Sequence, residues 1–151
     1  MIKLSKLTDY AVVVMAQMAR ADGGVHTVTQ LAENTGVPAP TVAKLLKILA
    51  PAGLMVSHRG AAGGYALSRS AERITVADII SALEGPISIT SCVEGAEGGC
   101  GVERLCPMRG NWDRVNAAVR AALESVTLAD MSVHPPLPAA MAAPALRATA
   151  G

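Results

Sequence analysis

Two short helices joined by a rigid connector are the strongest constraint that this sequence places on its fold. Thr27 and Gln30 form a capping box, the pair that begins a helix, and Gly36 ends that helix one or two turns later. Residues 37–40 read Val-Pro-Ala-Pro, a tight connector. A second helix is predicted from about Pro40 to Ala50. Its apolar residues are spaced to share one buried face: Val42, Leu45, Leu46 and Leu49.

A third helix precedes these two, and a glycine-rich hairpin follows them. Thr8 is the expected N-cap of a helix running to about Arg20, with an apolar face made of Ala11, Val12, Met15, Met18 and Ala19. Residues 54–57 and 65–67 read as two short strands, and residues 58–64 as their flexible tip. Three helices followed by a hairpin is the order of a winged helix-turn-helix domain.

The remaining chain predicts a helix, an irregular loop and a second, longer helix. Thr75 and Asp78 form a capping box for a helix that ends near Glu84. An amphipathic helix is predicted from about Asn111 to Val126, with a stripe of Trp112, Val115, Val119, Leu123 and Val126. We therefore divide the chain into a winged-helix domain (1–86), a cysteine-rich loop (87–109), a dimerisation helix (110–131) and a disordered tail rich in Ala and Pro (132–151).

The predicted fold class is mainly α: a winged helix-turn-helix with a small β-hairpin wing, a cysteine loop and a long C-terminal dimerisation helix. Composition agrees, because 51% of the residues are hydrophobic but only 2% are aromatic and none is Phe. A core of aliphatic side chains and methionines suits packed helices better than a sheet sandwich. No run of residues is long and apolar enough to span a membrane, so we expect a cytoplasmic protein with no membrane partner.

A net charge of +1 means that any DNA-binding role depends on local clusters of charge. Thr41, Lys44 and Lys47 share the free face of the second helix of the predicted helix-turn-helix, the helix that enters the major groove in such domains. Arg59 at the hairpin tip suits insertion into the minor groove, and His58 beside it is a candidate phosphate contact. The same residues would also fit an ordinary solvated surface.

All three cysteines lie in one glycine-rich loop, with the spacing Cys92-x7-Cys100-x5-Cys106. The glycines let the backbone bring three thiolates together, and thiolates are soft ligands that suit an iron–sulfur cluster or zinc. Three ligands leave one coordination position to be filled from elsewhere. A thiol redox switch without metal, a zinc site completed by a histidine and structural free thiols stay open as alternatives.

Several of these motifs match a known family. The chain resembles the cluster-binding winged-helix regulators of the IscR and NsrR type, and most closely the SUF-system iron–sulfur assembly regulators. The likeness covers about residues 1–131. The matching stretches are 4–11, 38–46, 58–60, 63–65, 77–80, 84–86, the three cysteines, 106–112 and 127–131.

The resemblance implies a homodimer that binds a roughly palindromic stretch of double-stranded DNA through two recognition helices. It implies an iron–sulfur cluster, 2Fe–2S or 4Fe–4S, held by Cys92, Cys100 and Cys106, and a role in repressing iron–sulfur assembly genes. The IscR type supplies a histidine where this chain has Arg109. The NsrR type uses an aspartate donated by the partner subunit, and Asp9 stands at the matching place.

Three other functions compete with the cluster-sensing regulator. A nitric-oxide-sensing or redox-sensing regulator would share the fold and differ in its signal. A small redox or cluster-carrier protein would leave the basic helix without a role. An enzyme is least favoured, because the sequence holds no phosphate-binding glycine motif and no recognisable nucleophile–base pair.

Overall fold

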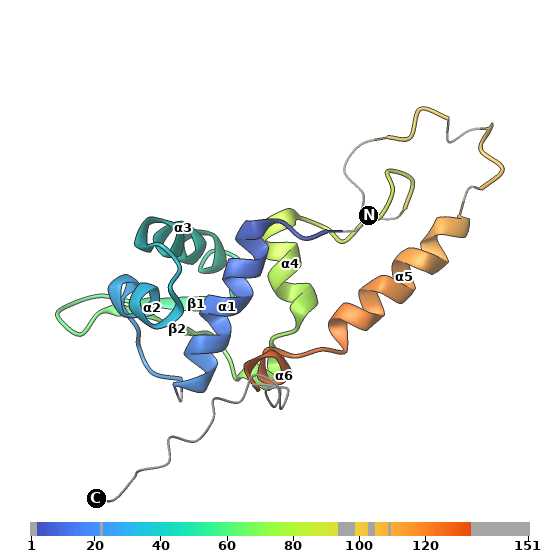
Figure 1. Ribbon diagram of the computed structural model, residues 1–151. Coiled ribbons are helices and arrows are strands. Elements are labelled where there is room, and N and C mark those ends of the chain that lie inside the picture. The colour runs from blue at the N-terminus through green and yellow to red at the C-terminus, as the bar shows by residue number, and fades with distance from the viewer. Residues whose placement is uncertain (1–2, 22, 94–98, 103–104, 109, 134–151) are drawn as a thin grey trace, which may run out of the picture.

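The computed structural model describes residues 3–21, 23–93, 99–102, 105–108 and 110–133 (Figure 1). The helices and strands in these ranges are, in order, α1 (Lys6–Arg20), α2 (Val28–Thr35), α3 (Ala39–Leu49), β1 (Met55–His58), β2 (Gly64–Leu67), the 3-10 helix η1 (Ala71–Arg73), α4 (Val76–Glu84), α5 (Asn111–Glu124) and α6 (Leu128–Ser132). This order confirms the predicted fold class, a mainly helical chain with one antiparallel hairpin. The expected tail lies almost wholly outside the described residues.

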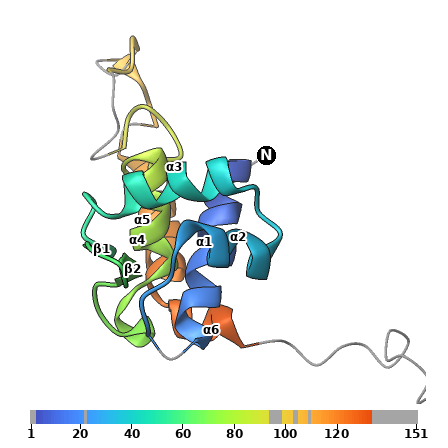
Figure 2. The ribbon, with the colours of Figure 1, turned by 90° about the vertical axis from the view of Figure 1, so that its left-hand side faces the viewer.

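Helix α1 is the centre of the fold, and α2, α3, α4 and α6 all pack against it (Figure 2). The core is aliphatic, as the composition predicts. Its largest fully buried side chains are Met15, Met18, Leu31, Leu45, Leu46, Leu49, Ile74, Ile79 and Leu128. The apolar face predicted for α3 is buried in full, which fixes the opposite face of that helix toward solvent.

The hairpin is short and is joined to the chain ahead of α2. Met55 pairs with Leu67 at its base and His58 with Gly64 at its tip. His26 adds a single bridge to Tyr65, through two backbone hydrogen bonds of 2.8 Å each. A Cβ atom on Gly64 would lie 2.4 Å from the carbonyl oxygen of His26, so only glycine fits where these backbones approach.

Helix signals that depend on neighbours in the sequence are confirmed, whereas the N-cap of α1 was wrongly predicted. The capping boxes at Thr27 and Thr75 are both formed. However, Ser5 and not Thr8 caps α1. Thr8 lies inside the helix and is fully buried, and its hydroxyl donates a hydrogen bond to the carboxylate of Glu84 at the end of α4. The Ser5 side chain accepts from Thr8 N–H as the N-cap, and Ser5 N–H donates to Glu84 as well.

Helix α5 ends at Glu124, close to the end expected near Val126, but the single dimerisation helix expected over 110–131 is interrupted after Glu124. Thr127 forms a capping box with Asp130 and begins the five-residue helix α6, which the sequence did not predict. The chain here pairs with the start of α4: Val76 N–H donates to the Val126 carbonyl at 2.9 Å. Leu128 is then fully buried against α1. The C-terminal end of α5 is therefore fixed to the winged-helix domain.

The body of α5 stands apart from the bundle formed by α1–α4 (Figure 1). It packs mainly on α4, and much of its apolar stripe stays accessible: Trp112 is 40% exposed and Val115 is 46% exposed. A helix that leaves such side chains in solvent is short of a partner within the described chain.

The contact of Glu84 with α1 predicts a loss of stability in acid. Hydrogen bonds from the Thr8 hydroxyl and the Ser5 backbone N–H hold the pKa of Glu84 below its ordinary value of 4.5. A lowered pKa in the folded state means that this stabilisation is present above about pH 4.5 and is lost as the pH falls through the folded value. We expect the urea midpoint to drop over this range.

The variant Glu84→Gln keeps an oxygen acceptor but cannot titrate, so its urea midpoint should depend less on pH. Because the carboxylate is exposed, we expect the variant to lose less than about 1 kcal/mol at neutral pH. The matched control is Glu33→Gln, on the exposed side of α2. If Glu84→Gln and Glu33→Gln follow the same pH curve as the wild type, then Glu84 contributes nothing to acid sensitivity.

Candidate nucleic-acid interface and cysteine loop

Helix α3 presents the predicted recognition face. Pro38 stands at its N-cap and Pro40 in its first turn, so the helix begins abruptly after the connector. Lys44 and Lys47 are exposed and Thr41 is half-buried. The burial of Val42, Leu45, Leu46 and Leu49 turns the other face of α3 toward solvent. Helix α3 and helix α5 lie on opposite sides of the molecule (Figure 1).

The wing tip carries the other predicted contacts. His58 and Arg59 are both exposed. The tip is tight: Gly63 N–H donates to the Gly60 carbonyl at 2.9 Å, and a Cβ atom on Gly63 would lie 2.6 Å from the His58 carbonyl oxygen. Gly60 has a φ of +103°, a conformation that favours glycine. The glycines therefore hold Arg59 at the end of a narrow turn.

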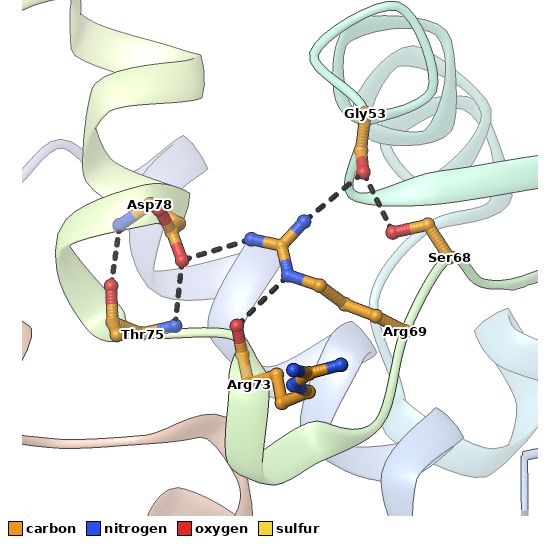
Figure 3. Close-up of polar contacts among 6 residues, drawn as sticks. All are labelled: Gly53, Ser68, Arg69, Arg73, Thr75 and Asp78. Carbon is orange, nitrogen blue, oxygen red and sulfur yellow. Dashed lines mark hydrogen bonds and ion pairs between the residues drawn. The ribbon is translucent and has the colours of Figure 1, made fainter.

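Arg69 links the wing to the two helices beside it (Figure 3). Its guanidinium donates to the Gly53 carbonyl after α3 at 3.4 Å, and to the Arg73 carbonyl at 2.8 Å. It also forms an ion pair with Asp78 at 3.0 Å, in the first turn of α4. A planar donor group with three partners fixes their relative positions. Arg69 therefore connects the segment after β2 to the turn after α3 and to the start of α4.

The carboxylate in this group is kept charged. Partial burial acts to raise the pKa of Asp78, but the hydrogen bonds from Thr75 and the charge of Arg69 outweigh it and hold that pKa below its ordinary value. The link between the wing and α4 is therefore complete at neutral pH and weakens only in acid.

The three cysteines are free, half-buried thiols. Cys92 follows the end of α4 at Glu84 by eight residues. Its Sγ atom lies 3.3 Å from the Thr90 hydroxyl oxygen. Within the described residues, no three Cys, His, Asp or Glu side chains lie close enough together to hold a metal ion. Residues 94–98, 103–104 and 109 of this loop lie outside the described part, and they include Arg109.

Asp9 is exposed in the first turn of α1, and it lines a shallow groove together with Val13, Gln17 and Met131. Asp9 belongs to no group of three possible metal ligands within the described residues.

Two polar side chains were not anticipated from the sequence as parts of this region. Glu84 ties the end of α4 to the start of α1, as described above. Asn116, on α5, is 5% exposed and bonds to the backbone of Ile87 and Ile89 ahead of the first cysteine. Asn116 follows Trp112 by four residues and precedes Val119 by three, so its position within the apolar stripe of α5 was a signal that the sequence analysis missed. Its partners are backbone atoms of a loop, which the sequence does not mark.

No helix in the described ranges combines the length and the apolar character that crossing a bilayer requires.

Comparisons with known proteins agree on one family. Residues 4–134 match the family model of Rrf2, described as an iron-dependent transcriptional regulator. The HTH-type transcriptional regulator CymR of Bacillus subtilis is 33% identical over 133 residues, which are 87% of this chain and 91% of that protein.

Two solved structures resemble the fold closely. The structure of CymR, the global cysteine regulator of B. subtilis, has a TM-score of 0.67 and 34% identity, and the match covers 87% of this chain and 97% of that chain. The structure of T. potens IscR has a TM-score of 0.63 and 32% identity, covering 86% of this chain and 85% of that chain.

Proposed function

The chain belongs to the Rrf2 family of DNA-binding transcriptional regulators, and from this premise we propose that it senses iron–sulfur clusters and represses the genes of their assembly. It is a regulator and not an enzyme. The observation that carries the proposal is the set of three free thiols on one loop, in a chain whose family is described as iron-dependent.

The donor set suits the proposed group. Cys92, Cys100 and Cys106 are half-buried, so their sulfur atoms are neither packed in the core nor fully in water. Thiolates at partly shielded positions are the usual ligands of 2Fe–2S and 4Fe–4S clusters. A bound cluster would join the three thiolates and change the local charge. Because the loop leads directly into α5, binding of a cluster would bias the position of that helix.

We infer a homodimer from the state of α5. Trp112 and Val115 are exposed on a helix that has few neighbours of its own. Pairing of two α5 helices would bury these side chains, and a two-fold axis would place two α3 helices along one roughly palindromic site. Thr41, Lys44 and Lys47 would then face the major groove, with His58 and Arg59 beside the backbone and the minor groove.

In such a dimer, Asp9 is the proposed fourth ligand, supplied to the partner's cysteines. We expect Asp9→Asn to shorten the lifetime of the cluster about tenfold, because an amide is a poorer iron ligand than a carboxylate. The measurement is the decay of visible absorbance in air. The dimer should persist in size-exclusion chromatography, because Asp9 is exposed and has no role in the core.

The control for Asp9 is Gln17→Ala, which alters the same groove two turns further along α1. An unchanged cluster lifetime in Asp9→Asn would mean that the fourth ligand lies elsewhere. Equal losses in both variants would mean that the groove acts through packing and not through ligation.

The proposed function is tested by anaerobic purification of the full chain. Visible absorption, iron and acid-labile sulfide should all be present, and a fluorescently labelled operator should be bound with different affinity before and after the cluster is removed by a chelator. A colourless protein after anaerobic handling and reconstitution would overturn the proposal that the chain binds a cluster. Equal operator affinity with and without the cluster would overturn the proposal that the cluster controls DNA binding.

A thiol-based redox sensor is the second candidate, and one observation favours it. The three cysteines are free thiols, and the similar protein from B. subtilis is named a global cysteine regulator. Such a sensor would change its DNA affinity on treatment with a mild oxidant while containing no iron.

A nitric-oxide sensor would instead lose its cluster absorbance on exposure to a nitric oxide donor, faster than on exposure to air.

A further inference from the structure

Asn116 is a buried polar side chain in the middle of a helix whose other residues are exposed or half-buried. It is 5% exposed, whereas Val115 beside it is 46% exposed. Within the described residues, only Thr8 and Asn116 are both buried and polar. A side-chain amide removed from water is costly unless it is hydrogen-bonded, so the burial of Asn116 requires partners.

Both ends of its amide are satisfied by one short piece of backbone. The Oδ1 atom accepts a hydrogen bond from Ile89 N–H at 3.1 Å, and the Nδ2 atom donates to the Ile87 carbonyl at 3.1 Å. Arg120, one turn further along α5, donates to the same carbonyl at 3.5 Å. Residues 87–89 belong to no helix or strand. The amide of Asn116 therefore supplies the hydrogen bonds that a neighbouring strand would otherwise give to this backbone.

These bonds hold one end of the cysteine loop on the helix that carries its other end. Ile89 comes three residues before Cys92, while Cys106 comes five residues before α5 begins at Asn111. Asn116 lies five residues into that helix, about 7.5 Å along its axis. Asn116 therefore closes the segment 90–110 into a loop whose two ends are held on the first half of α5.

We propose that Asn116 is a positioning residue for the cluster, and this inference rests on the proposed function. Because Asn116 fixes the ends of the loop, the conformational entropy of the loop is reduced already when the protein folds. Less of that entropy is then lost when the thiols bind iron. It also fixes Cys92 relative to α5, since Cys92 follows Ile89 by only three residues. Residues that hold metal ligands in place alter metal retention without touching the metal.

Three variants test this inference in the full-length protein. Asn116→Ala removes both bonds. Asn116→Asp keeps the acceptor for Ile89 N–H but loses the donor to Ile87. Arg114→Ala is the control, because Arg114 is exposed on the same helix and on another face. We expect the cluster to be lost to a chelator about tenfold faster in Asn116→Ala, at an intermediate rate in Asn116→Asp, and at the wild-type rate in Arg114→Ala.

A second measurement uses the cluster-free protein. Amide hydrogen exchange at Ile89 should be faster in Asn116→Ala than in Asn116→Asp, while the thermal midpoint reports general stability. If Ile89 exchanges equally fast in all variants, or if cluster loss is unchanged in Asn116→Ala, the inference is overturned. If the alanine variant does not fold, the aspartate variant decides by the same two criteria.

The failures of this inference and of the proposed function are distinguishable. A wild-type chain that never acquires iron and sulfide overturns the proposed function and this role of Asn116 with it. A wild-type chain that carries a cluster, with equal retention in Asn116→Ala, overturns the positioning role alone.

Discussion

Replacing Cys106 by alanine should give a colourless protein with a normal fold. The variant would lose one of the three thiols in the chain, which would leave the proposed cluster with two cysteine ligands in place of three. We expect iron and acid-labile sulfide to fall to background after anaerobic purification. The thermal midpoint of the cluster-free form should change by no more than a few degrees, because Cys106 is half-buried in an irregular loop and outside the core.

Two further variants make the result specific. Cys106→Ser keeps the size of the side chain but offers a harder oxygen ligand, so it should also be colourless. Ser91→Ala, at an exposed position of the same loop, should keep full absorbance. Normal iron content in Cys106→Ala would show that this thiol is not a ligand. Loss of iron in Ser91→Ala as well would show that the loop tolerates no substitution, and the assignment of Cys106 would then lack support.

Features that depend on neighbours in the sequence were predictable, and features that depend on distant backbone were not. The capping boxes of α2 and α4 are formed by residues three apart, so their type and spacing were sufficient. Thr8 is a residue type that favours N-caps, but Ala11 three residues later cannot complete a capping box, and Thr8 lies inside α1 with its hydroxyl bonded to Glu84. Helix α6 is an exception, because it begins with a local capping box of the same kind, Thr127 and Asp130, and was still missed. Its five residues are too few to show the periodicity that would have drawn attention to that signal.

The cysteine loop illustrates the same limit. Its residue types predict metal ligands, because the affinity of thiolates for metals and the flexibility of glycines depend on residue type and not on the fold. The contact that holds one end of the loop could not be predicted. Asn116 binds the backbone N–H of Ile89 and the backbone carbonyl of Ile87, and every residue type except proline offers both groups. The single dimerisation helix expected over 110–131 is divided into α5, which ends at Glu124, and α6, which begins at Leu128. Its role in pairing two chains stays a prediction.

The second large effect concerns DNA binding by α3. Lys44→Ala combined with Lys47→Ala should lower operator affinity by about 100-fold at low salt, because each subunit of a dimer would give up two cations that can pair with phosphates. The slope of log affinity against log salt should also become shallower, by about 0.9 for each phosphate that is no longer neutralised. Both lysines are exposed, so the thermal midpoint and the cluster content should stay unchanged. Fluorescence anisotropy across a range of salt concentrations measures both quantities.

The matched control is Lys3→Ala combined with Arg114→Ala, which removes the same charge from exposed positions outside α3. If binding depended only on the net charge of +1, both double variants would weaken it equally. A loss confined to the α3 variant would instead assign DNA binding to the face that Val42, Leu45 and Leu46 fix toward solvent by their burial. Unchanged affinity in that variant would contradict α3 as the recognition helix. The burial that packs one face of α3 against the core therefore determines which of its residues are exposed and available to contact DNA.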